Sequence, residues 1–223
     1  MDNSKKINFD FNAQFNWGKQ YWLSKTDFID WYRYLFMIKE LMRFKPRTIL
    51  EIGEGGGVVK RVMKEAVEKY ETMDVNKKLE PTYLNDVRNL MPELKSKFDC
   101  VIAGDILEHI PFEDLEKALT NLYAYLKPNG RALITIPHRA SNFMYMTPLQ
   151  VPKAIRVPTG FLSMGAFYRR FIKRKIWIDP NHLWEISDGH HKIKDVEVKM
   201  KKVGFKMEKL QKLVYVDFWT LKK

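Results

Sequence analysis

Four glycines in five positions follow a short apolar run, and this spacing is suited to binding a nucleotide. The run covers residues 49–52, and the next five residues include Gly53, Gly55, Gly56 and Gly57. Glycine permits a tight turn and lets the backbone approach a ligand closely, because it has no side chain. A helix predicted over 58–66 would direct its unpaired backbone N–H groups at whatever lies over the turn. The segment therefore predicts a strand, a turn and a nucleotide-type cradle.

The glycine spacing distinguishes two kinds of cradle. Dinucleotide enzymes use G-x-G-x-x-G, but Val58 stands where their third glycine would be. The sequence instead reads E-x-G-x-G-x-G, formed by Glu51, Gly53, Gly55 and Gly57. Here the chain resembles the class I S-adenosylmethionine-dependent methyltransferases. The resemblance implies that the glycines form a turn against the methionine part of S-adenosylmethionine, and that Glu51 orders this loop or binds the ammonium group through water.

Further matches to that family follow in the family's order between residues 47 and 138. They are an acid ending the next apolar segment, an acid with an apolar neighbour, a D-x-L-E-H turn and an L-K-P-N-G turn: Asp74, Asp86 with Val87, 105–109 and 126–130. The resemblance implies that Asp74 accepts hydrogen bonds from both ribose hydroxyls and that Asp86 and Val87 bracket the adenine. Asp105 would face either the methionine end of the cofactor or the acceptor.

Two histidines are candidates for the base that methyl transfer to oxygen or nitrogen uses. His109 ends the D-x-L-E-H turn and His138 follows the fifth predicted strand. Both are therefore expected at the carboxyl ends of strands, where ligands bind in such sheets. A structural hydrogen bond is the alternative role for each.

The remaining histidines flank a short motif, His182-x-Trp184-Glu185, that resembles acceptor-side architecture in some small-molecule methyltransferases. His190 and His191 follow it directly. Because no third ligand stands at a metal-binding spacing, we expect no metal site.

Alternating helix and strand patterns position these residues. Apolar residues recur at helical spacing in three segments: 26–44, 113–126 and 192–203. Residues 205–221 are predicted as two strands. The alternation favours an α/β fold with a doubly wound, mostly parallel sheet and an insertion after the fifth strand. The connection 75–85 contains Pro81 and is too short for the usual crossover helix, so we expect a loop and a short edge strand at 82–85.

The composition is that of a single enzyme domain. The chain has 223 residues, 45% of them hydrophobic, and no apolar run approaches the ~18 residues of a membrane span. The single Cys100 and a start without an apolar signal region predict a reducing, cytoplasmic location. We expect one domain, 1–223, made of a helical cap, a cofactor-binding core, an acceptor-side insertion and a C-terminal helix with strands: 1–46, 47–138, 139–191 and 192–223.

Positive charge is concentrated around the insertion. The chain carries a net charge of +12, and residues 117–178 contain eleven Lys and Arg but no Asp or Glu. Three interpretations remain open: a solvated basic face, a pocket or lid that recruits an anionic acceptor, and an aromatic, basic element that contacts an anionic membrane. Nucleic acid is not expected, because no recognition module is present.

These observations predict an S-adenosylmethionine-dependent methyltransferase that acts on a small molecule, with anionic and lipid-linked acceptors included. Two alternatives stay open. An NAD(P)-dependent reductase would use a similar cradle, although Val58 and the D-x-L-E-H turn disfavour it. A non-catalytic nucleic-acid-binding or membrane-binding protein with a relic fold is favoured by the charge alone.

Overall fold

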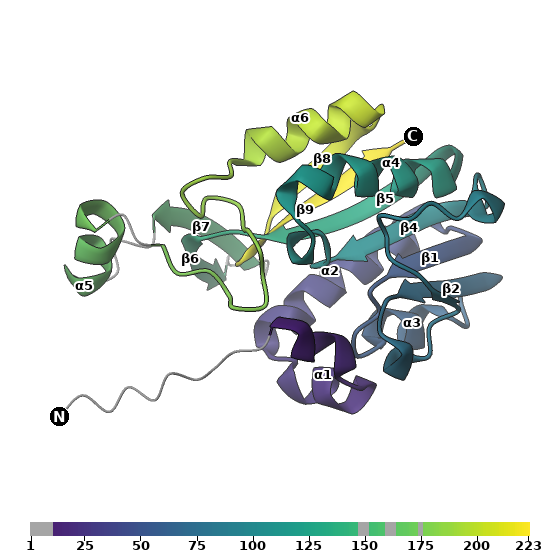
Figure 1. Ribbon diagram of the computed structural model, residues 1–223, viewed down its shortest axis with the longest axis horizontal. Coiled ribbons are helices and arrows are strands. Elements are labelled where there is room, and N and C mark those ends of the chain that lie inside the picture. Colours follow the sequence, from purple (N-terminus) through teal and green to yellow (C-terminus); the bar gives the residue numbers. More distant parts are fainter. Residues whose placement is uncertain (1–10, 147–151, 159–163, 174–175) are drawn as a thin grey trace.

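A seven-stranded mixed sheet organises the chain (Figure 1). The computed structural model describes residues 11–146, 152–158, 164–173 and 176–223. The strand order is β3-β2-β1-β4-β5-β9-β8. In that order the strands are Tyr83–Leu84, Lys69–Asp74, Thr48–Ile52, Phe98–Gly104, Leu126–Pro137, Val216–Lys222 and Lys206–Lys212. The pairings from β3 to β5 are parallel, and β9 is antiparallel to both β5 and β8. The predicted α/β class and mostly parallel sheet are confirmed.

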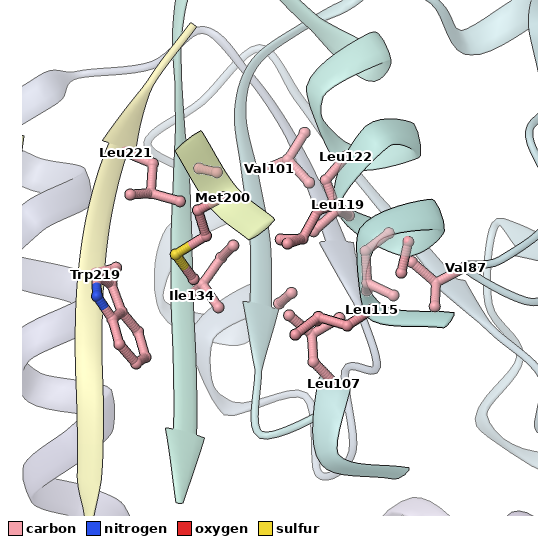
Figure 2. Packing of buried hydrophobic residues seen from close by; sticks show 14 of the residues in the cluster. Val87, Val101, Leu107, Leu115, Leu119, Leu122, Ile134, Met200, Trp219 and Leu221 are labelled. Carbon is pink, nitrogen blue, oxygen red and sulfur yellow. The ribbon is translucent and has the colours of Figure 1, made fainter. Parts of the chain in front are cut away.

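Helices cover both faces of this sheet, as a doubly wound fold requires. On one face α4 (Leu115–Tyr125) and α6 (Ile193–Val203) bury their apolar stripes against the sheet. Figure 2 shows Leu119 and Leu122 of α4 close to Val101 of β4, and Met200 of α6 close to Ile134 of β5. On the other face lie α2 (Phe28–Phe44) and α3 (Val58–Met63).

Helix ends follow local sequence signals. At the start of α2, Asp27 accepts hydrogen bonds from the backbone N–H groups of Ile29 and Asp30, and the Asp30 side chain accepts one in return. Such a capping box satisfies N–H groups that have no partner within the helix. At the end of α6, Gly204 adopts φ +112°, a conformation that suits glycine. The helices predicted over 26–44, 113–126 and 192–203 are therefore present within a few residues.

The connection between β2 and β3 contains no α-helix. It consists of a 3-10 turn, Lys77–Leu79, before the two-residue β3. The reduced connection predicted from the sequence is confirmed. Loop residues of this connection, and no α-helix, line the cavity that is described below.

Two regions were not predicted as regular elements. Before α2 the chain forms a 3-10 helix, Phe11–Asn16, and a short helix α1, Lys19–Lys25. After β5 it forms an antiparallel hairpin of β6 (Ala140–Met146) and β7 (Pro152–Pro158), followed by α5 (Met164–Phe167) and a π-helical turn. Figure 1 shows the hairpin and α5 extending away from the main sheet. No helix in the described ranges is long and apolar enough to cross a membrane.

Candidate active site

The sheet topology creates a site beside the central strand. From β1 the chain crosses to β2 on one side, and β4 pairs with β1 on the other. Ligands bind outside the carboxyl ends of the strands at such a switch point. A cavity of about 650 Å³ lies there. Eight of the ten predicted site residues line it: Glu51, Gly53, Gly55, Asp74, Asp86, Val87, Asp105 and His109.

The glycine turn has the conformation that its sequence predicts. Gly53, Gly55 and Gly57 have φ values of +72°, +49° and +69°, which L-residues with side chains rarely adopt. A Cβ on Gly53 would lie 1.9 Å from Cδ1 of Ile106. Gly57 lies outside the cavity lining and is the N-cap of α3. Gly57 therefore shapes the turn, and its contact with the cofactor stays a prediction.

Glu51 is buried at the floor of the cavity, where its carboxylate accepts a hydrogen bond from the Tyr70 hydroxyl at 2.8 Å. Burial raises the pKa of Glu51 to about 8, because ionisation in a poorly solvated site is unfavourable. The group is thus mostly protonated at neutral pH in this structure. A cation placed beside it would favour the ionised form.

The acids predicted for the adenosine part lie in different environments. Burial raises the pKa of Asp74 to about 6, and its carboxylate accepts the backbone N–H of Asn76 at 2.8 Å. The Asp86 carboxylate is held by Arg88, at 2.6 Å to Nη2, and that hydrogen bond lowers the pKa of Asp86. Asp74 therefore retains more acceptor capacity for a ligand than Asp86 does. Val87 is buried in the same wall.

Asp105 follows β4 directly and has several hydrogen-bond and ion-pair partners. Its φ of +53° is positive, which is uncommon for a residue other than glycine. Thr135 at the end of β5 donates to Oδ1 at 2.6 Å, and the Tyr215 hydroxyl lies 3.0 Å from Oδ2. Arg33 of α2 approaches Oδ2 at 3.3 Å and also pairs with Asp30. Although burial opposes it, the nearby carboxylates raise the pKa of Arg33, with Asp105 contributing most. These contacts fix a charged polar wall at one end of the cavity.

His109 shares that end of the cavity with His182, and their ring centroids are 5.0 Å apart. Nδ1 of His109 lies 2.7 Å from the Asn181 carbonyl oxygen. A carbonyl can only accept, so Nδ1 carries the hydrogen and Nε2 has the lone pair. Burial lowers the pKa of His109 to about 4, with His182 adding to the effect. His109 is therefore neutral at physiological pH.

His182 connects two buried carboxylates. Its Nδ1 is 2.7 Å from Oε1 of Glu185, and its Nε2 is 3.8 Å from Oε1 of Glu108. Burial alone would lower the pKa of His182, but the hydrogen bond to Glu185 and the charge of Glu108 raise it. Burial raises the pKa of Glu108, whose side chain is fully inaccessible.

His138 does not reach the cavity. It is 3% exposed and its backbone N–H donates to the carbonyl of Tyr215 at 2.8 Å. It also forms an isolated bridge with Ile186. The geometry does not favour the predicted catalytic role of His138, because its side chain is absent from the cavity lining and its backbone joins β5 to the segments around Tyr215 and Ile186.

The N-terminal segment covers the glycine turn, a feature that the sequence did not reveal. Trp22 lines the cavity, and a Cβ on Gly55 would lie 3.9 Å from its Cγ. Lys19 of α1 pairs with Glu54 of the turn at 3.3 Å. Nδ2 of Asn76 donates to the Trp17 carbonyl at 2.8 Å. The α1 region therefore contacts both the turn that follows β1 and the loop that follows β2.

The insertion presents apolar side chains to solvent. Phe167, Ile172 and Trp177 are 40%, 62% and 66% exposed. Lys173 is exposed beside them. The side chains of most of the other basic residues predicted to matter here, including Arg169, Arg170 and Arg174, lie outside the described part of the structure, so the three interpretations of this region stay open.

Comparison with known proteins decides the family. A family model described as a methyltransferase domain matches residues 26–210. The chain belongs to this methyltransferase family. The matched part of the chain is therefore an S-adenosylmethionine-dependent methyltransferase domain, with S-adenosylmethionine as its cofactor. The reductase and the non-catalytic relic are set aside.

Individual relatives are distant. The chain is similar to the ubiquinone biosynthesis O-methyltransferase of Rickettsia felis, with 28% identity over 163 residues that cover 67% of this chain and 62% of that protein. It thus spans less than two thirds of that relative. Among solved structures it resembles the N-methyltransferase NodS of Bradyrhizobium japonicum, with a TM-score of 0.58, 10% identity and 96% of each chain covered. A Burkholderia thailandensis 1,6-didemethyltoxoflavin N1-methyltransferase gives a TM-score of 0.53 and 14% identity, with 85% of this chain and 76% of that chain covered.

Proposed function

We propose that this methyltransferase transfers the methyl group of S-adenosylmethionine to an oxygen of a small hydroxylated acceptor. The observation that carries the proposal is a single cavity with two chemically different ends. In the cavity lining, the glycine turn, Asp74 and Asp86 follow β1, β2 and β3, whereas Asp105 and His109 follow β4 on the other side of β1, and His182 lies beside His109.

The first end suits the cofactor. Gly53 and Gly55 allow the backbone to approach the methionine part, and Glu51 is positioned for its ammonium group. Asp74 has a carboxylate with which to accept ribose hydroxyls. When bound, the cofactor supplies an electrophilic methyl group on sulfur, so the protein's main contributions are in-line placement and removal of the acceptor's proton.

The second end suits a hydroxyl acceptor. Asp105 and Tyr34 can hydrogen-bond a hydroxyl, and Arg33 supplies positive charge in the same wall. Nε2 of His109 has a lone pair and can accept the hydroxyl proton. The name of the Rickettsia felis relative specifies O-methyl transfer, which agrees with this chemistry, whereas the N-methyltransferases above share the fold alone.

Anionic or lipid-linked acceptors remain part of the proposal. Arg33, Lys25 and Arg88 line the cavity, and an anionic group would be attracted by their positive potential. The exposed apolar residues of the insertion could contact a lipid tail or a membrane surface.

The test is a measurement of S-adenosylhomocysteine formation with three matched sets of small aromatic acceptors, which carry a hydroxyl, a carboxylate or an amine. We expect turnover with hydroxyl compounds and its loss in the Asp105→Asn variant. Turnover confined to the amine set would overturn the proposal. Binding of S-adenosylmethionine, measured separately by calorimetry, establishes that the enzyme used is competent.

A further inference from the structure

Three potential metal ligands meet at the acceptor end of the cavity. In the described part of the chain, Glu108, His109 and His182 each offer a ligand atom, and these atoms lie within 4.8 Å of one another. We propose that they bind one divalent transition-metal ion of the zinc type, with a coordination position open to the cavity.

Both imidazoles are oriented for this role by their other nitrogen. Nδ1 of His109 donates to the Asn181 carbonyl oxygen, and Nδ1 of His182 contacts the Glu185 carboxylate, each at 2.7 Å. Metal-binding histidines commonly donate their second N–H to a carbonyl or carboxylate in this way, which fixes the tautomer and turns the other nitrogen to the metal. In both residues Nε2 is the nitrogen left for a ligand.

Glu108 supplies an independent observation. Its side chain is fully buried, and neither carboxylate oxygen has a hydrogen-bond partner. A buried polar group without a partner is costly, and a buried charge more so. The two Nε2 atoms lie 4.0 Å (His109) and 3.8 Å (His182) from Oε1 of Glu108. A cation between the three groups would satisfy the orphaned carboxylate.

The two distances from Glu108 fit an ion with small movements, and the ligand atoms of the two histidines lie within 4.8 Å of each other. A tetrahedral zinc ion with bonds of about 2.0–2.2 Å holds its ligand atoms roughly 3.3 Å apart. The atoms at 3.8 and 4.0 Å must therefore approach by roughly half an ångström. Two imidazoles and one carboxylate favour zinc, iron, cobalt or nickel over magnesium, which prefers oxygen ligands and water.

The outer contacts of the cluster are also ordered. Glu185 is fully buried and is paired with Arg139, and it accepts the backbone N–H of Asp179 at 2.9 Å. Leu183 donates its backbone N–H to the carbonyl of Glu108 at 2.9 Å. These contacts attach the segment that carries His182 to the turn that carries Glu108 and His109.

The expected consequence for chemistry rests on the proposed function, whereas binding of the ion does not. His109 and His182 line the cavity, so an acceptor hydroxyl could occupy the open position. The ion would lower the pKa of that hydroxyl. Its O–H bond breaks with the proton passing to water. The oxygen lone pair then forms the bond to the methyl carbon while the carbon–sulfur bond breaks, which leaves S-adenosylhomocysteine. His109 would then bind the metal and would not act as the base.

This inference reverses the expectation of no metal site. No third ligand stands at a metal-binding spacing in the sequence around these histidines. The structure brings His182 to Glu108 and His109 from a distant segment, so no local pattern could indicate the set.

The experiment uses the full chain, stripped with a chelator and titrated with Co²⁺ or Zn²⁺ by calorimetry and by the visible absorption of Co²⁺. We expect one ion per chain, with little competition from excess Mg²⁺. Glu108→Gln and His182→Asn should each lower the Co²⁺ affinity by at least about tenfold. The matched control is His190→Gln, because His190 is exposed in the same segment and should leave the affinity unchanged.

The outcomes are distinct. Binding of S-adenosylmethionine and the thermal melt show whether a variant is folded. If Glu108→Gln is not folded, His109→Gln takes its place in the metal titration. No Co²⁺ binding by the parent, or binding lost in His190→Gln and kept in Glu108→Gln, would overturn the site. The cluster would then be structural, with His182 hydrogen-bonded to Glu185 and paired with Glu108 by charge alone. Metal binding without methylation of any hydroxyl compound would support the site and count against the proposed function alone.

Discussion

The hydroxyl of Tyr215 lies 3.0 Å from Oδ2 of Asp105, which joins the turn between β8 and β9 to the end of β4. The same hydroxyl is 2.9 Å from Oδ1 of Asp30. One hydroxyl carries one hydrogen, so it cannot donate to both carboxylates at once. Arg33, which pairs with both, supplies the missing positive charge. The contact with Asp30 also ties α2 to this wall of the acceptor end.

Replacing Tyr215 with Phe should therefore destabilise the protein. Removing the hydroxyl leaves the partly buried carboxylates of Asp30 and Asp105 with one donor fewer, which costs about 1–3 kcal/mol. Urea denaturation of the parent and variant measures this difference. Tyr123→Phe is the control, since that ring lies on α4, remote from the cavity lining, and should change the unfolding free energy by less than about 0.5 kcal/mol. Equal stability of the parent and Tyr215→Phe would show that the hydroxyl contributes nothing.

Gly55→Val should abolish S-adenosylmethionine binding while leaving the fold largely intact. The turn holds Gly55 at φ +49°, which a β-branched residue adopts only with strain. The added side chain would also point toward Trp22. Gly18→Ala is a suitable control, because no atom lies within 4 Å of its added Cβ. Calorimetric binding by Gly55→Val within a few-fold of the parent would show that the cradle lies elsewhere.

Asp74→Ala should weaken S-adenosylmethionine binding by at least about tenfold. The carboxylate can accept two ribose hydroxyls, and each hydrogen bond to a charged group is worth about 1.5–3 kcal/mol. A titration of each variant gives the dissociation constant. Glu65→Ala removes an equal charge from an exposed position and should bind like the parent. If both variants bind equally well, another residue holds the ribose.

The affinity for S-adenosylmethionine should rise as the pH rises from about 6 to 8. Glu51 is raised to a pKa of about 8 by burial, with Tyr70, Glu54, Lys60 and Arg33 around it. An ammonium group nearby favours the ionised carboxylate, so binding near pH 7 should release about one proton.

Calorimetry in two buffers of different ionisation enthalpy counts that proton. The cofactor's own amino group titrates near pH 8 as well, and Glu51→Gln corrects for it because the variant keeps the cavity shape without the carboxyl. The same proton release in both proteins would remove Glu51 from the ammonium site.

Removing four charges from the insertion should abolish binding to anionic vesicles. The variant replaces Arg169, Arg170, Lys173 and Arg174 with Gln. Association through basic residues weakens as charge falls and as salt rises, while the cofactor affinity should not change. A variant with four substitutions near α6 is the control: Lys194, Lys201, Lys202 and Lys206 to Gln. Two results together would favour the interpretation of a solvated basic face: no binding of the parent to vesicles, and the same KM for the acceptor in the parent and the variant.

Local rules account for much of the fold. The capping signal at Asp27 and Asp30 defines the start of α2, and the apolar periodicity of α4 and α6 defines their buried faces. The glycine turn was predictable because glycine, which has no Cβ, adopts positive φ values without strain. Periodicity did not predict α1, which is seven residues long with no buried residue and no side-chain cap.

The site was predictable only where it follows the strands. His109 and His138 both follow strands in the sequence, yet only His109 faces the cavity. His138 is buried, and its backbone pairs with Ile186. Tyr215 and His182 reach the site by tertiary packing. The motif His182-x-Trp184-Glu185 gave a sequence signal for His182, whereas no pattern around Tyr215 indicated its place.

The position of α1 has a consequence for the kinetics of the enzyme. Leu23 lies directly against the turn, since a Cβ on Gly56 would be 2.9 Å from its Cδ2. We expect exchange of a cofactor bound beneath α1 to require movement of this helix and loss of its pairing with Glu54. We therefore expect the cofactor product to leave last and at a rate set by that motion. Slow exchange would make the turnover rate depend on solvent viscosity, whereas the rate of methyl transfer itself would not depend on viscosity.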